Sequence, residues 1–186
     1  MGNAKARTAG RTSTKADPFD DEMFANRNDR WLTPLEIIRS LGDFDLDPCA
    51  APGHPTAAER WTPEEIGDGL SMPWFGRVWL NPPYGRESRV WMERMVVHGH
   101  GTALIPVATG TRLWQEVVFP HATAILFYRH RVTFIHPKGD SGGMVSPAAS
   151  ALIAFGNRDA TALRDSGLPG YFLPVAYDEE PRDTPV

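Results

Sequence analysis

The chain has 186 residues, of which 19 are lysine or arginine and 23 are aspartate or glutamate, so its formal net charge at pH 7 is −4. This length suits one domain with tails and excludes two full-sized domains. The single cysteine, Cys49, excludes an internal disulfide and a zinc site built from cysteines. Because about 18 consecutive apolar residues occur nowhere, we expect no membrane span, and we expect a cytoplasmic protein.

Charge is segregated along the chain. Residues 1–28 are basic and poor in apolar side chains, which predicts a disordered basic arm, whereas residues 176–186 form an acidic tail. The folded part is expected to be a single domain over residues 29–175. Within it, residues 77–138 contain eight basic and three acidic side chains. A phosphate-binding surface needs such a segment, although scattered solvated charges would account for it equally well.

Hydrophobic periodicity predicts helices that alternate with strands. Thr33, Pro34 and Glu36 fit a capping box, in which Thr33 is the N-cap of a helix that runs to about Leu41. Further helices are expected at 90–97 and 111–118, and strands at 44–47, 77–81, 102–106, 122–128, 131–135 and 149–155. This order favours an α/β fold in which helices flank a minimal, mostly parallel sheet. Ligands of such folds bind beyond the carboxyl ends of the strands.

The segment Asn81-Pro82-Pro83-Tyr84 follows one predicted strand end and suits methyl transfer to a planar amine. Such a nitrogen is a weak nucleophile because its lone pair is delocalised, and two acceptors aimed at its N–H bonds would stabilise the charge that develops on attack. The side-chain carbonyl of Asn81 and the backbone carbonyl of Pro82 can supply them, since consecutive prolines stiffen the turn. Tyr84 offers a face for stacking the target ring. A loop in which Asn81 only caps a helix and Tyr84 packs is the alternative.

A second candidate segment, Asp47-Pro48-Cys49-Ala50, follows the first predicted strand. A carboxylate followed by small residues lets a ligand approach the backbone closely and hydrogen-bond to the acid. Asp68, which precedes Gly69, adds a second acid in the same third of the chain. Taken alone, each segment could also be an ordinary turn, because a complete glycine-rich nucleotide-binding motif is missing.

Between Trp31 and Phe155 the motifs follow a specific order: Trp-x-Thr-Pro, Phe-Asp-Leu-Asp-Pro-Cys-Ala, Asp-Gly-Leu, Arg-Val-Trp-Leu-Asn-Pro-Pro-Tyr-Gly, Leu-Ile-Pro and a late Arg-Val-x-Phe strand. This order resembles the phage-type Dam family of DNA N-6-adenine methyltransferases. The resemblance implies a Rossmann-like methyltransferase fold, S-adenosylmethionine as cofactor, and methyl transfer to the 6-amino group of an adenine flipped out of DNA. A phage gene would place the protein in the cytoplasm of a bacterial host.

The resemblance also implies roles for individual residues. The catalytic motif corresponds to Asn81, Pro82, Pro83 and Tyr84. The cofactor-binding set is Thr33, Pro34, Asp47, Pro48, Ala50, Asp68 and Asn81, with Thr33 and Pro34 beside the methionine end. The chain departs from the family at two positions: Ala51 stands where many methyltransferases have a loop glycine, and Ala108 stands where the family usually has an arginine.

DNA is the expected partner. Its phosphates would be bound by Arg86, Arg89, Arg129, Arg131 and Lys138, and its bases read by loops 85–89 and 136–145. We expect a monomer or weak dimer and no metal site. Two alternatives remain open: a methyltransferase that acts on protein glutamine or on RNA, and a DNA-binding module with degraded activity.

Overall fold

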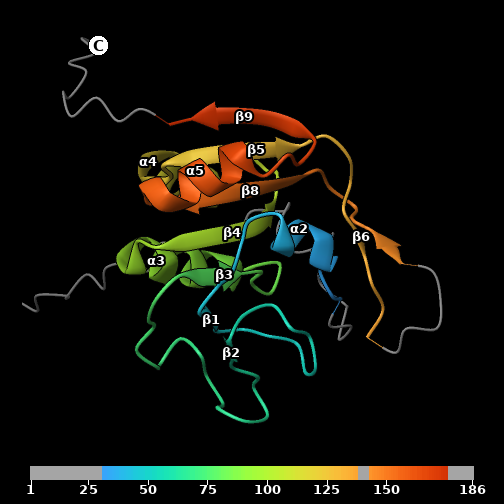
Figure 1. Ribbon diagram of the computed structural model, residues 1–186. Helices are drawn as coiled ribbons and strands as arrows, with labels where there is room; N and C mark the ends of the chain where they lie inside the picture. The colour runs from blue at the N-terminus through green and yellow to red at the C-terminus, as the bar shows by residue number, and fades with distance from the viewer. Residues whose placement is uncertain (1–30, 138–142, 176–186) are drawn as a thin grey trace, which may run out of the picture.

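A seven-stranded mixed sheet forms the centre of the computed structural model, which describes residues 31–137 and 143–175 (Figure 1). The strand order is β2-β1-β3-β4-β8-β5-β9. The strands are β1 (Leu46–Asp47), β2 (Glu59–Arg60), β3 (Val78–Leu80), β4 (Gly101–Pro106), β5 (Ala124–Tyr128), β8 (Ser150–Phe155) and β9 (Gly170–Pro174). A separate two-stranded sheet pairs β6 (Thr133–Phe134) with β7 (Met144–Val145). The predicted basic arm and acidic tail lie outside the described residues.

The sheet is parallel in one half and antiparallel in the other. Strands β2, β1, β3 and β4 run parallel, whereas β8 is antiparallel to both β4 and β5, and β9 is antiparallel to β5. The predicted α/β class with a helix-flanked sheet is therefore confirmed, but the sheet is mixed. The difference arises after β5, where the β6–β7 pair rather than a crossover helix leads the chain to β8.

Helices cover both faces of the sheet (Figure 1). The helices are α2 (Leu35–Arg39), α3 (Ser88–His98), the π-helix η1 (Leu113–Val118), α4 (Phe119–His121) and α5 (Asn157–Asp165). Side chains alternate along β3, so that Val78 and Leu80 pack with α3 and η1, while Trp79 packs with α2 and α5. The sequence missed α5 because its buried face consists of only Asp159 and Leu163.

The predicted capping box at the start of α2 does not form. The N-cap of this helix is Pro34, and no side chain caps it. The Thr33 hydroxyl instead accepts a hydrogen bond from Asn81 Nδ2 at 3.2 Å. A capping oxygen accepts from the N–H groups of the first helical turn, whereas the Thr33 hydroxyl makes its side-chain contact with Asn81 and Pro34 takes the N-cap position.

One basic residue of the middle segment is structural. Arg77 is buried, and its Nε donates to Asp159 Oδ1 at 2.6 Å, which ties the start of β3 to α5. Its Nη1 donates hydrogen bonds to the backbone carbonyls of Leu41 and Asp43. Arg77 is therefore unavailable to a phosphate.

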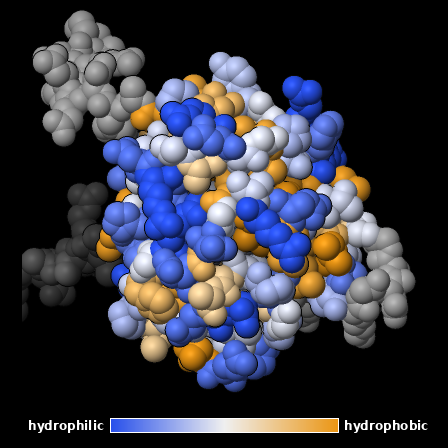
Figure 2. All heavy atoms as spheres, viewed as in Figure 1, coloured by the Kyte–Doolittle hydropathy of each residue, from blue (hydrophilic) through white to orange (hydrophobic). Residues whose placement is uncertain are grey.

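The face of the molecule drawn in Figure 2 is mainly polar. Figure 2 shows hydrophilic side chains with smaller hydrophobic areas between them on the face drawn. Among the described residues, no helix has the length and apolar character needed to cross a membrane.

Candidate functional site

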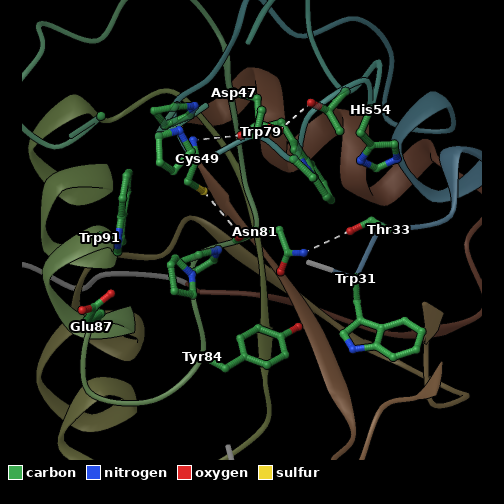
Figure 3. Close-up of a pocket in the computed structure, with 18 of the residues that line it drawn as sticks. Trp31, Thr33, Asp47, Cys49, His54, Trp79, Asn81, Tyr84, Glu87 and Trp91 are labelled. Atoms are coloured by element: carbon green, nitrogen blue, oxygen red, sulfur yellow. Dashed lines mark hydrogen bonds between the residues drawn. The ribbon is translucent and has the colours of Figure 1, made fainter. Parts of the chain in front are cut away.

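A cavity of about 580 Å³ opens beyond the carboxyl ends of β1 and β3 (Figure 3). It brings together the two segments singled out by the sequence. Of the predicted catalytic and cofactor residues, those that line it are Thr33, Asp47, Pro48, Ala50, Asp68, Asn81, Pro82, Pro83 and Tyr84. Pro34 is buried beside Thr33 and does not line it.

The two segments meet because their strands are neighbours. Strands β1 and β3 pair in parallel, with Leu46 opposite Val78, so their carboxyl ends lie at the same edge of the sheet. Asp47 ends β1 and Asn81 follows β3 directly. Between the two loops, Cys49 Sγ donates to the backbone carbonyl of Asn81 at 3.3 Å.

The Asn81 side chain presents an acceptor to the cavity. Its amide nitrogen donates to the Thr33 hydroxyl at 3.2 Å, which fixes the amide plane. Its carbonyl oxygen, Oδ1, is buried and has no hydrogen-bond partner in the part of the chain that the structure describes. A buried carbonyl without a partner costs free energy, so this oxygen is a candidate to bind a donor on a ligand.

The residues after Asn81 continue the wall of the cavity. Ser88 Oγ donates to the Pro83 carbonyl at 2.6 Å, which anchors the second proline to the first turn of α3. The Tyr84 ring packs edge-on against Phe134, with 6.4 Å between ring centroids. Burial raises the pKa of the Tyr84 phenol, so the ring stays neutral at physiological pH.

Asp47 is a buried acid within reach of a ligand. It is 3% exposed, and its Oδ1 accepts the Cys49 N–H at 3.1 Å while its Oδ2 accepts the Thr56 hydroxyl at 2.5 Å. Burial raises the pKa of Asp47 to about 6, and hydrogen bonds from Thr56 and Cys49 oppose the rise. Asp47 therefore changes charge near neutrality.

The loop that carries Asp68 is pressed against the Asp47 loop. A Cβ at Gly69 would lie 2.0 Å from the Pro48 carbonyl oxygen, so only glycine permits this approach. The Gly69 carbonyl accepts the Trp74 indole N–H at 2.8 Å. Asp68 Oδ1 accepts the Leu70 N–H at 2.9 Å, which shapes the turn and leaves this exposed acid at the cavity rim.

Sequence reasoning missed several lining residues. His54 is buried, and its Nε2 has no hydrogen-bond partner among the described residues. The sequence also did not place several other lining residues at the site: Trp31, Thr56, Glu87, Phe134 and Met144. A sequence signal existed only for His54 and Thr56, which follow Asp47 within one short loop containing Gly53.

The cavity has two chemically different ends (Figure 3). Figure 3 shows Tyr84 and Trp31 at one end and Asp47, Cys49 and His54 at the other, with Asn81 between them. The charged acids of the lining are Asp47, Asp68 and Glu87, and no lysine or arginine lines it within the described ranges. An acidic cavity of this kind favours a cationic ligand.

The residues predicted to bind DNA differ in their exposure and in whether an acid pairs with them. Arg86, Arg129 and Arg131 are exposed. Arg89 forms ion pairs with Glu93 at 2.7 Å and Glu116 at 2.8 Å, which compensate its charge. Lys138 lies outside the described residues.

Comparison with known proteins gives one match. The family model described as DNA N-6-adenine-methyltransferase (Dam) matches residues 21–164, which is most of the chain. Neither the curated proteins nor the solved structures give a match. The chain therefore belongs to the Dam family of DNA N-6-adenine methyltransferases, and membership implies that activity, with DNA as the substrate.

Proposed function

We propose that the cavity transfers the methyl group of S-adenosylmethionine to the 6-amino group of an adenine flipped out of DNA. The observation that carries this proposal is the Asn81 carbonyl oxygen, which is buried, without a partner among the described residues, and part of the cavity wall. An exocyclic amine supplies the N–H group that this oxygen requires.

The chain's own groups would position the amine and stabilise its charge. Asn81 Oδ1 accepts one N–H bond of the amine, and the backbone carbonyl of Pro82 accepts the other. Both oxygens stabilise the positive charge that grows on the nitrogen as it attacks. Because the Thr33 hydroxyl holds the Asn81 amide nitrogen, the carbonyl needs little reorganisation when the amine arrives.

The aromatic end of the cavity suits the base. Tyr84 offers a ring for stacking, and Phe134 supports that ring from the side. An adenine within a duplex is stacked and paired, so it must be extruded before its amine can reach Asn81. Unstacking costs a few kcal/mol, which contacts with this end of the cavity would offset.

The acidic end suits the cofactor. S-adenosylmethionine carries a sulfonium and an ammonium group, and it supplies an electrophilic methyl group when bound. The carboxylates of Asp47 and Asp68 favour that positive charge and can accept hydrogen bonds from ribose hydroxyl groups. A volume of about 580 Å³ lies within the range of small-molecule sites, about 300–1,000 Å³.

A single comparison tests this function. The protein is incubated with methyl-labelled S-adenosylmethionine and DNA, and the DNA is then hydrolysed to nucleosides. We expect label in N6-methyladenine, and we expect Asn81→Ala to lower the rate by about 10² to 10³, the effect of removing one preorganised charge-stabilising group. Asn157→Ala is the matched control, because Asn157 is an exposed residue of α5 outside the cavity.

The remaining candidates are outcomes of the same experiment. RNA and protein acceptors are offered in parallel with DNA. Label in RNA or in protein glutamine side chains would show that the acceptor is RNA or protein rather than DNA. A protein that shifts duplex DNA in a gel but labels none of the acceptors would be a binding module, and the methyl-transfer proposal would then be wrong.

A further inference from the structure

His54 is a buried polar side chain for which neither the catalytic motif nor the acids provide a role. The residue is 7% exposed and lines the cavity. Figure 3 shows it beside Thr33, on the side of the cavity opposite Trp91. Its ring nitrogen Nε2 is buried and lacks a hydrogen-bond partner among the described residues.

The backbone holds His54 in this position. The His54 N–H donates to the Ala51 carbonyl at 3.2 Å, and the His54 carbonyl accepts the Thr56 N–H at 2.9 Å. Gly53 has a φ of +72°, which lets the chain turn sharply before the histidine. One short loop thus places Thr56 against Asp47 and His54 against Thr33.

The surroundings of the His54 ring bear on its charge and on which ring nitrogen carries the proton. Burial lowers the pKa of His54, so the imidazole is neutral at pH 7. A hydrogen bond to the backbone of Thr33 favours the protonated ring, so the ring donates to that carbonyl. Nε2 has no partner among the described residues, so in the tautomer that carries its proton on Nδ1, Nε2 keeps a lone pair that can accept a hydrogen bond. The cavity therefore contains a fixed neutral acceptor.

The chemistry of the cofactor narrows what this acceptor can bind. A lone pair repels a carboxylate and attracts an ammonium group, and the amino-acid end of S-adenosylmethionine carries one of each. Thr33 contacts both Asn81, through its hydroxyl, and His54, through its backbone. The methyl group must face Asn81 for transfer, and only a short carbon chain separates the sulfonium from the ammonium group.

We infer that His54 is a cofactor-binding residue, whose Nε2 accepts a hydrogen bond from the ammonium group of the S-adenosylmethionine amino-acid end. This inference rests on the proposed function, since it names a contact within the same site. No lysine or arginine of the described residues lines the cavity, so the ammonium group has no competing cation there. His54 and the carboxylates together favour a ligand that presents an ammonium group to this end of the cavity.

Binding of two ligands to three proteins tests the inference. The ligands are S-adenosylhomocysteine and its deaminated analogue, which keeps the carboxylate and lacks only the ammonium group. The proteins are the wild type, His54→Leu and His54→Gln, and affinity is measured by titration calorimetry. We expect His54→Leu to weaken S-adenosylhomocysteine about ten- to hundredfold, which is the loss of one hydrogen bond to a charged group. We expect the affinity of the analogue to stay unchanged.

His54→Gln provides the conservative variant, because a glutamine side-chain carbonyl can accept the same hydrogen bond. It should retain most of the affinity that His54→Leu loses. Unchanged binding of the deaminated analogue to His54→Leu would show that the variant is folded. An equal loss for both ligands, or no loss for either, would overturn the inference. If the wild type binds neither ligand, the proposed cofactor site itself is wrong, and the inference falls with it.

Discussion

The orientation of the Asn81 amide depends on one hydroxyl group. Asn81 Nδ2 donates to Thr33 Oγ1 at 3.2 Å, and this bond leaves Oδ1 toward the cavity. Without this bond, the Asn81 amide can rotate and present its N–H groups to the incoming amine. The N–H groups of the amide and of the amine are both donors, so they would repel each other. We expect Thr33→Val to lower kcat at least tenfold, since a misplaced acceptor stabilises the transition state poorly.

The split between kcat and cofactor affinity separates two roles for Thr33. If Thr33 orients Asn81, the Kd for S-adenosylhomocysteine stays close to the wild-type value while kcat falls, and Thr33→Ser restores kcat. A loss confined to cofactor affinity would instead indicate the direct cofactor contact that the family resemblance implies. Single-turnover methylation and equilibrium binding measure the two quantities.

The buried carboxyl group of Asp47 makes both stability and binding depend on pH. Its pKa is raised from 3.8 to about 6 by burial, so between these values the folded protein binds more protons than the unfolded chain. The contribution of Asp47 to the free energy of unfolding is therefore greatest below pH 4 and falls as pH rises to about 6, by about 3 kcal/mol. Ionised Asp47 attracts a cationic cofactor, so affinity for S-adenosylmethionine should rise over pH 5–7.

Asp47→Asn isolates this residue from the other titrating groups. The variant keeps a similar shape but does not ionise, so it should flatten most of the rise in affinity. Any rise that remains would report the deprotonation of His54, whose pKa is lowered by burial. Identical pH profiles of affinity in the wild type and Asp47→Asn would contradict the role given to Asp47.

At the scale of elements, the acidic end of the cavity, where we propose that the cofactor binds, depends on two loops that meet through their backbones. The contact between Gly69 and the Pro48 carbonyl leaves no space for a Cβ atom, which would lie 2.0 Å from that oxygen. Since this obstacle is backbone, Gly69→Ala must push the Asp68 loop away from the Asp47 loop. We expect a loss of about 1–3 kcal/mol in the free energy of unfolding and a weaker cofactor site.

Gly110→Ala is the matched control for this change. A Cβ at Gly110 would meet no atom within 4 Å, and its φ is not positive, so the substitution should be nearly neutral. Thermal unfolding with and without S-adenosylhomocysteine measures both effects, because a ligand that binds the folded state raises Tm. Equal Tm values for the two variants would show that the loop contact is unimportant.

The sequence predicted which segments would meet at a cavity better than it predicted the whole sheet, and particular residues explain why. The Asn-Pro-Pro-Tyr segment and Asp47 each follow a strand, and parallel neighbours bring strand ends together without further information. The antiparallel position of β8 depends on long-range pairing with β4, which periodicity within one segment does not contain. Thr33 shows the same limit, because its bond to Asn81 joins residues 48 positions apart.

At the scale of the whole molecule, net charge conceals which arginines can reach DNA. Arg77 is buried against Asp159, and Arg89 and Arg112 are both paired with Glu116. These guanidinium groups are already compensated. In contrast, Arg129 and Arg131 are exposed, and no ion pair among the described residues includes either of them.

The position of Arg129 and Arg131 makes them the stronger candidates for phosphate contacts. They lie between β5 and β6, and β6 continues to Phe134 in the wall of the cavity at its aromatic end. If a flipped base stacks on Tyr84 as we propose, its DNA passes close to this segment. Each phosphate contact releases condensed counterions, so it contributes about 0.9 to the slope of log K against log salt concentration for duplex DNA.

We therefore expect Arg129→Ala and Arg131→Ala each to reduce that slope by about one and to weaken binding similarly for all DNA sequences. Arg89→Ala should change the slope much less, because Glu93 and Glu116 already balance its charge. Fluorescence anisotropy with a short duplex over a series of salt concentrations measures the slope. A larger change for Arg89→Ala than for the other two variants would move the DNA path to the α3 side of the cavity, where Arg89 lies.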